Sequence, residues 1–130
     1  MNTKFSITRL IPILIIAICT SILFHSCKKD ENKAVDRTSY YGTWGVSSNC
    51  GGFNDITIVA SSNANEIEIQ GLAESYTVHA TVNGASFTIP SQQTYDNYTA
   101  SGSGTLSSDG KTITMSYDIF GPCNDTWTKK

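Results

Sequence analysis

The sequence predicts an all-β domain over residues 39–130, an eight-stranded antiparallel up-and-down meander that closes into a small barrel. Three observations predict this class. Short segments after Tyr40 alternate between apolar and polar residues, turn-forming pairs separate these segments, and two cysteines flank most of the series. No window shows the apolar stripe of an amphipathic helix. This length supports one domain with one core.

The N-terminus has the features of a secretory signal. Lys4 and Arg9 are followed by fifteen mostly apolar residues, 10–24, and no acidic residue occurs in this part of the chain. A basic segment before an apolar segment is the layout of a signal peptide. A membrane-spanning anchor is the alternative, but it requires about 20 apolar residues, and Pro12 and His25 interrupt or end this shorter run.

The end of the apolar segment resembles a bacterial lipobox, in which a small residue precedes a cysteine that is diacylated and becomes the mature N-terminus. The matching residues are "LFHSC", 23–27. Ser26 fits the pattern, whereas Phe24 and His25 depart from it. The resemblance implies a signal peptide of residues 1–26 and a lipid on Cys27 that anchors the protein in the membrane. A chance cysteine beside an ordinary cleavage site is the alternative.

The residues after this cysteine resemble the surface-export signal of Bacteroidota lipoproteins, which is a lysine and two acidic residues. Lys29, Asp30 and Glu31 occupy those places. The resemblance implies an outer-membrane lipoprotein that faces the cell surface, with the periplasmic face as the alternative. Residues 27–38 are rich in charge and lack periodicity, so we expect them to form a flexible tether.

Eight segments of the remaining chain are expected to be strands: 41–48, 56–62, 66–72, 76–82, 86–90, 98–106, 112–120 and 126–130. In the third segment Ile67 and Ile69 alternate with Glu66 and Glu68, which is typical of a strand with one buried face. An eight-stranded barrel is just wide enough for its inward side chains, so we expect a mostly packed interior. The predicted core includes Trp44, Ile58, Ile69, Val78, Phe87, Ile113, Met115 and Trp127.

Turn chemistry and the cysteines predict the topology. Asn83-Gly84 and Asp109-Gly110 are tight-turn pairs, and short connections favour a meander. If the sheet closes, the end of the first strand lies beside the start of the eighth, where Cys50 and Cys123 are expected. A disulfide requires Cα atoms within about 7 Å, and an exported domain keeps its disulfides. We therefore predict a Cys50–Cys123 bond, with two separate buried thiols as the alternative.

Gly42-Thr43-Trp44 resembles the Gly-x-Trp signature of lipocalins. In that family the tryptophan plugs the closed end beneath a basic side chain from the last strand, which implies Lys129 or Lys130 near Trp44. The second lipocalin motif is missing and no C-terminal helix follows. Residues 40–130, with "YGTW", "FTIPSQ", "GSGTL" and the terminal Cys, Trp and Lys, are most similar to small lipocalin-like lipoproteins of Bacteroidota, a resemblance that implies no activity.

The composition excludes several classes of function. Residues 27–130 contain seven basic and eleven acidic residues, a net charge of −4, which gives no basic surface for nucleic acid. His79, the one histidine after residue 26, has the strand parity of Thr77 and Thr81 and is expected to face solvent. No nucleophile and base can be assembled from these residues, so we expect no catalytic residues. We expect a monomeric binding protein that uses neither a cofactor nor a metal. A weak calcium site at Asp96 and Asn97 is an alternative to simple turn formation.

The longer connections, after the odd-numbered strands, should lie together at the end of the barrel opposite Trp44. They or their flanks carry the candidate ligand-binding residues Phe53, Asp55, Tyr95, Tyr98 and Phe120. Aromatic side chains with a few polar groups on rigidly held loops fit a small apolar or sugar ligand. A protein-binding accessory or inhibitor subunit of a surface complex is the alternative function. The alternative to ligand binding is a structural role, in which these aromatic residues only cover the end of the hydrophobic core.

Overall fold

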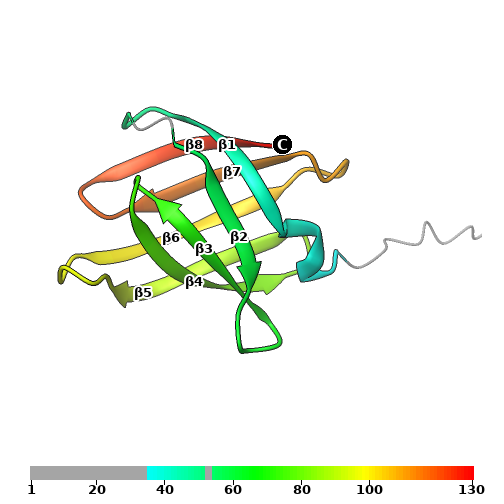
Figure 1. Cartoon of the computed structure of the whole chain (residues 1–130), viewed down its shortest axis with the longest axis horizontal. Coiled ribbons are helices and arrows are strands. Elements are labelled where there is room, and N and C mark those ends of the chain that lie inside the picture. The colour runs from blue at the N-terminus through cyan, green and yellow to red at the C-terminus, as the bar shows by residue number, and fades with distance from the viewer. Residues whose placement is uncertain (1–34, 52–53) are drawn as a thin grey trace, which may run out of the picture. The chain divides into compact units, whose positions relative to one another are not determined.

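A computed structural model describes residues 35–51 and 54–130 as a closed antiparallel barrel (Figure 1). Each strand pairs with its neighbours in sequence, and β1 pairs with β8. The predicted all-β meander is therefore confirmed. Within these two ranges, no helix is long and apolar enough to span a membrane. A 3-10 turn, η2 (Arg37–Tyr40), precedes the strands β1 (Gly42–Ser48), β2 (Ile56–Ala60), β3 (Glu66–Leu72), β4 (Tyr76–Asn83), β5 (Ser86–Gln93), β6 (Thr99–Leu106), β7 (Thr112–Asp118) and β8 (Pro122–Lys129).

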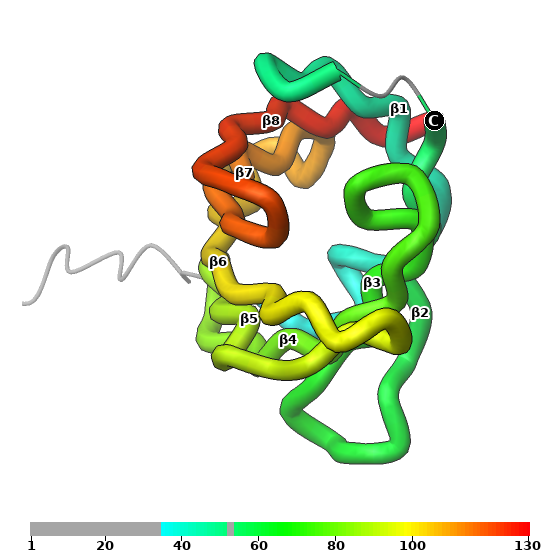
Figure 2. Tube along the Cα trace, turned by 90° about the vertical axis from the view of Figure 1, so that its left-hand side faces the viewer, coloured from blue at the N-terminus to red at the C-terminus, as the bar shows by residue number. Residues whose placement is uncertain are grey.

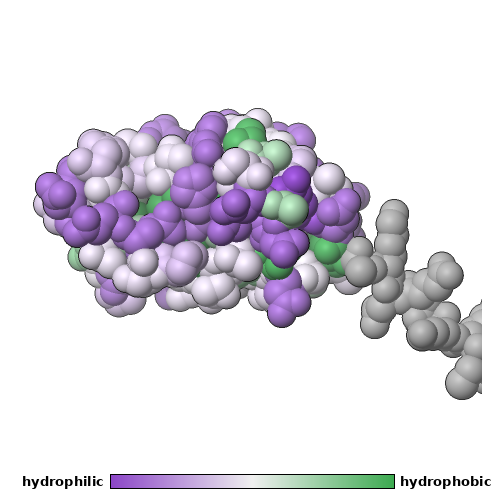
Figure 3. Space-filling model, turned by 90° about the horizontal axis from the view of Figure 1, so that it is seen from below, coloured by the Kyte–Doolittle hydropathy of each residue, from purple (hydrophilic) through white to green (hydrophobic). Residues whose placement is uncertain are grey.

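The two ends of the barrel differ in their connections. We call the end where β1, β3, β5 and β7 finish the mouth; it faces the viewer in Figure 2. The opposite end, the base, carries η2 and the short connections after β2, β4 and β6. As the alternation predicts, the outer wall carries mostly hydrophilic and neutral residues on the side shown in Figure 3.

The interior is filled by apolar side chains, and all eight residues of the predicted core are buried. Near the base Phe87 lies between Tyr40, edge-on at 5.6 Å, and Trp127, stacked at 6.4 Å between ring centroids. Gly104 faces the Phe87 ring so closely that a Cβ atom there would overlap it. A glycine in β6 therefore makes room for an aromatic ring from β5.

Contacts between η2 and the strands close the base. The indole nitrogen of Trp44 donates a 2.9 Å hydrogen bond to the Tyr40 carbonyl. The Nζ atom of Lys129 lies 5.2 Å from the Trp44 ring centroid and donates to the Ser39 carbonyl at 3.0 Å. Arg37 donates to two backbone carbonyls at the β2–β3 connection. The basic side chain that the Gly-x-Trp resemblance implies over the tryptophan is thus present.

A disulfide joins Cys50 to Cys123, with the Cα atoms 5.7 Å apart, which confirms the predicted pairing. The predicted start of the last strand at residue 126 is wrong, because β8 begins at Pro122 and contains Cys123. The ladder with β7 begins at the pair Asp118 and Pro122. Proline lacks an N–H donor but is tolerated as the first residue of a strand. The predicted seventh strand is correspondingly two residues too long at its end.

The predicted end of the fifth strand at Pro90 is also wrong, because β5 continues to Gln93. The register with β6 shifts between Ile89 and Gln92, so the proline falls in an irregularity where its missing N–H is not needed. The Gln92 side chain then accepts from the His79 amide at 3.0 Å and donates to the His79 carbonyl at 2.8 Å. A side-chain amide therefore bridges β4 and β5 beyond their backbone ladder.

Candidate functional site at the mouth

An open pocket of about 450 Å³, which we call the mouth pocket, lies at the mouth. One wall is the Cys50–Cys123 disulfide, a second is Ile119–Gly121 at the β7–β8 connection, and a third is the β3–β4 turn at Ala73 and Glu74. Tyr117 also lines it. Small-molecule sites typically have volumes of about 300–1,000 Å³, so the mouth pocket is large enough for a small ligand.

The β3–β4 turn that forms one wall has a strained backbone. Ala73 and Glu74 have φ angles of 45° and 75°, a region that residues other than glycine seldom adopt. The connection has three residues, 73–75, and the two positive φ angles at its start match the right-handed twist of the paired strands. Gly71, with φ of 88°, lies in the register shift just before this turn. Backbone strain of this kind collects at functional sites, and here it places Glu74 on the wall of the mouth pocket.

Four aromatic residues lie together beside this pocket, and we call them the aromatic cluster. The ring centroid of Tyr76 is 5.4 Å from that of Tyr95 and 5.7 Å from that of Phe120. Phe120 meets Tyr98 edge-on at 4.7 Å. Tyr76 is buried, whereas the exposed fractions of Tyr95, Tyr98 and Phe120 are 77%, 48% and 63%. Three exposed rings thus surround the buried ring of Tyr76.

Asp96 fixes this cluster from the β5–β6 connection. Its carboxylate accepts from the Tyr76 hydroxyl at 2.7 Å and from the Thr94 hydroxyl at 2.8 Å. Burial, followed by the bond to Asp96, raises the pKa of Tyr76 to about 12. Although desolvation acts in the opposite direction, these hydrogen bonds lower the pKa of Asp96. Asn97 has a φ of 69°, as expected in a turn.

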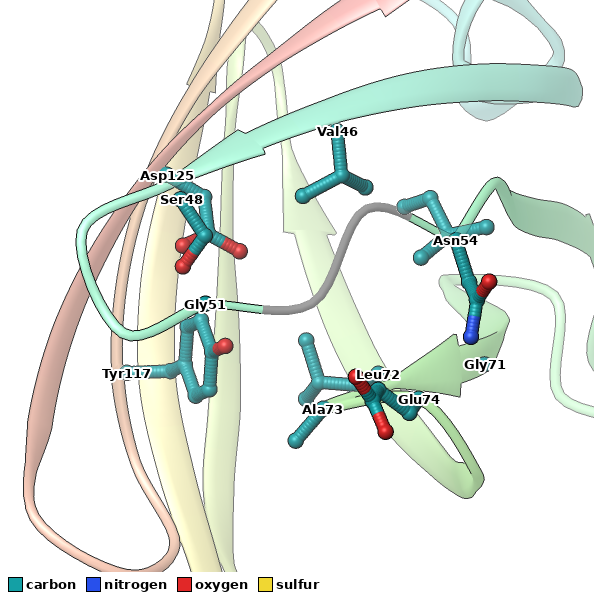
Figure 4. Close-up of a pocket in the computed structure, with 11 residues that line it drawn as sticks. Val46, Ser48, Gly51, Asn54, Gly71, Leu72, Ala73, Glu74, Tyr117 and Asp125 are labelled. Carbon is teal, nitrogen blue, oxygen red and sulfur yellow. The ribbon is translucent and has the colours of Figure 1, made fainter.

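A second, small cavity, which we call the niche, is lined by both polar and apolar residues (Figure 4). Its volume is about 10 Å³, room for a single water molecule. Asp125 of β8 and Ser48 of β1 are opposite each other in the ladder, and both side chains line the niche with Tyr117. Burial, and then the charge of Asp125, raise the pKa of Tyr117.

Asp125 is an inward-facing carboxylate with an exposed fraction of only 4%. Its Oδ2 atom accepts a 3.2 Å hydrogen bond from the Trp127 indole. Its Oδ1 atom has no hydrogen-bond partner among the residues that the structure describes. The sequence prediction missed this residue because it placed Asp125 before the last strand. Its parity with Cys123 and Trp127 was the signal that could have placed it inside.

The structure brings together Tyr95, Tyr98 and Phe120, three of the five predicted ligand-binding residues. Asp55 lies elsewhere, since it pairs with Lys130 at 2.6 Å beside the outward face of Gly45. Phe53 and the predicted lipidation site Cys27 lie outside the described residues. In residues 35–51 and 54–130, no group of three His, Cys, Asp or Glu is placed to hold a metal ion.

In comparisons with protein-family models, with curated proteins and with solved structures, nothing matches this chain. The class of protein is therefore described from its fold and its site alone. It is a small eight-stranded antiparallel barrel with an apolar interior and a disulfide-bridged mouth. The mouth carries an open pocket and exposed aromatic rings.

Proposed function

We propose that this protein is a lipoprotein of the outer membrane, anchored through Cys27 and facing the cell surface. Its barrel, which resembles a lipocalin, is a non-catalytic binding module for a small apolar or sugar ligand. The observation that carries this proposal is the mouth pocket of about 450 Å³ beside the exposed rings of the aromatic cluster. Concave sites with aromatic walls and a few polar groups are typical of ligand-binding proteins.

The filled interior supports a ligand site at the rim of the barrel. Buried side chains occupy the space that a deep ligand cavity would require, and the niche admits only one water molecule. The ligand therefore sits at the rim and contacts Phe120 and the β3–β4 turn. His79 supports a non-catalytic role, because it lies on the outer wall opposite Glu68 rather than at the mouth.

A protein partner is the second candidate function, and the exposure of Tyr95 and Phe120 favours it. Aromatic residues are enriched at the centres of protein interfaces, where their burial contributes much of the binding energy. In this reading the barrel is an accessory or inhibitor subunit of a surface complex. The aromatic cluster is then the contact surface, and the mouth pocket receives a side chain of the partner.

Single substitutions in the full-length protein, purified in detergent, test these proposals. Phe120→Ala and Tyr95→Ala should weaken capture of glycans or small apolar ligands while the thermal midpoint changes little, because both side chains are largely exposed. Lys111→Ala, in the β6–β7 connection at the base, is the control and should leave both properties unchanged. If both aromatic variants lose stability without any change in capture, the aromatics cap the core and the proposal fails.

Capture from native outer membranes separates the two candidate functions. A stoichiometric protein that cross-links to the wild type but not to Phe120→Ala would favour the accessory role. Binding of a glycan or small apolar molecule that competes with no protein would favour the small-ligand role.

A further inference from the structure

We propose that the aromatic cluster at the mouth is a docking surface for a protein that presents an arginine side chain. The guanidinium group of this partner stacks on the exposed rings of the cluster and pairs with the carboxylate of Asp96. This inference rests on the second candidate function, the binding of a protein partner, and states the chemistry of that partner.

The concentration of exposed rings in one place is the first observation. In residues 35–51 and 54–130, the large apolar side chains that are exposed are Tyr95, Tyr98 and Phe120, and all three belong to the aromatic cluster. They come from the β5–β6 and β7–β8 connections at the mouth, which faces the viewer in Figure 2. Exposed apolar residues are normally scattered singly over a surface, whereas a contiguous group indicates an interaction site.

Asp96 supplies a fixed negative charge within this surface. The bonds from the Tyr76 and Thr94 hydroxyls hold its carboxylate against the cluster, and the side chain is nevertheless exposed to a partner. Desolvation opposes ionisation, but the hydrogen bonds outweigh it and lower the pKa of Asp96, so the carboxylate is charged at neutral pH. A charged acceptor beside exposed rings favours a partner that is cationic as well as able to stack.

The distribution of charge over the barrel also favours a basic partner. Glu74 in the β3–β4 connection and Asp118 at the end of β7 are further exposed carboxylates at the mouth. The lysine and arginine side chains of the described residues lie instead at the base or on the outer wall. They are Arg37, Lys111, Lys129 and Lys130. The mouth therefore presents one sign of charge, and complementary charge steers and orients the association of proteins.

The arrangement of the rings selects a planar cation. The rings pack against one another with centroids 4.7 to 5.7 Å apart, so they form a platform and leave no space between them for a rounded ammonium group. The platform is open to solvent at Tyr95 and Phe120, with exposed fractions of 77% and 63%. A guanidinium group is planar, stacks on aromatic faces and bonds a carboxylate through two N–H groups, whereas a lysine ammonium is a compact, strongly hydrated charge. Arginine therefore fits this surface better than lysine does.

Three peptides that differ in one kind of side chain test the proposed chemistry. They are acetyl-Gly-Arg-Leu-Arg-Gly-amide and its analogues with lysine or citrulline in place of arginine. Citrulline has nearly the shape of arginine but no charge. Binding to the full-length protein in a neutral detergent is measured by ligand-observed NMR and by calorimetry. We expect saturable binding of the arginine peptide, severalfold weaker binding of the lysine peptide, and binding of the citrulline peptide weaker by about tenfold or more.

Matched variants test the assigned residues. Asp96→Asn removes the charge, so the arginine peptide should bind about tenfold more weakly. Asp109→Asn is the control and should leave binding unchanged, because Asp109 also accepts a hydroxyl bond within a turn, from Ser107, but lies at the base. Tyr95→Leu keeps an apolar side chain and removes the aromatic face, so binding should weaken severalfold. Thermal melts check folding, and if Asp96→Asn does not fold, the exposed substitution Tyr95→Leu decides.

Three results would overturn the inference. They are equal binding of the arginine and citrulline peptides, unchanged affinity in either folded variant, and no saturable binding of the arginine peptide up to about 10 mM. In each case a native outer-membrane protein that cross-links to the wild type but not to Phe120→Ala would still support the accessory function. Failure of the arginine assignment and failure of the protein-binding function are therefore distinguishable.

Discussion

The Nζ atom of Lys129 lies 5.2 Å from the centre of the Trp44 ring and 3.0 Å from the Ser39 carbonyl oxygen. The penultimate residue of the chain therefore links the last strand to the first strand and to η2. Because Trp44 also donates to the Tyr40 carbonyl, these contacts hold the 3-10 turn across the base.

Lys129→Met tests this contact, because methionine keeps most of the apolar length and removes the charge. The free energy of unfolding should fall by about 1 kcal/mol, the sum of a cation–π contact and a partly exposed hydrogen bond. Denaturant unfolding measures the change. Lys111→Met changes an exposed lysine in the β6–β7 connection, so it is the control and should be neutral. Equal stabilities of both variants would contradict a structural role for Lys129.

Removal of the Cys50–Cys123 disulfide should lower the free energy of unfolding by up to about 4 kcal/mol, since the bond closes a long loop in the unfolded chain. Denaturant unfolding with and without reductant measures this difference. The double variant Cys50→Ser/Cys123→Ser is the control and should not respond to reductant. Detection of two free thiols in the unreduced, denatured protein would contradict the pairing.

Gly104→Ala should destabilise the barrel by about 1–3 kcal/mol, because the new methyl group overlaps the Phe87 ring. Phe87 cannot move aside, since Tyr40 and Trp127 pack against it. Ser103→Ala, at the neighbouring exposed position of β6, is the control. Thermal or denaturant unfolding compares the two variants, and equal stability would show that the ring relaxes without cost.

Asp96 should make stability depend on pH on the acid side. Its pKa is lowered in the folded protein, so between the folded and unfolded pKa values the unfolded chain binds more protons. Asp96 therefore stabilises the fold fully at pH values above its pKa in the unfolded chain, about 3.9. This stabilisation is lost as the pH falls through the lower pKa that Asp96 has in the folded protein. Tyr76→Phe removes one donor to Asp96, so NMR titration should show a higher carboxyl pKa. An unchanged pKa would contradict the role of the Tyr76 bond.

The proposed anchor predicts that Cys27→Ser moves the protein from the membrane fraction to the soluble fraction, because the acyl chains provide the membrane affinity. Intact-mass analysis of the wild type should show a diacyl adduct, and its absence would contradict lipidation. Replacement of Asp30 and Glu31 by alanine should reduce cleavage by external protease while lipidation persists. Equal cleavage would leave no role for these residues in surface export.

Alternation of apolar and polar residues predicted the number and order of the strands and the core, because a half-buried strand has a period of two, but it did not predict every strand end. The two cysteines predicted closure, since an open sheet would hold them too far apart. Asp125 was missed because a carboxylate at an inward position breaks the very pattern on which the prediction depends. The continuation of β5 past Pro90 was missed because the Gln92 side chain supplies a bridge that local sequence does not encode.

The disulfide also changes the connectivity of the molecule. Because it joins Cys50 to Cys123, the chain between them is a covalent ring that includes all or part of every interstrand connection. One cut by a protease in any connection within this ring opens the ring but releases no fragment. The nicked protein keeps all eight strands on one molecule, so a barrel exposed to extracellular proteases can survive a cut that would divide an uncrosslinked chain in two.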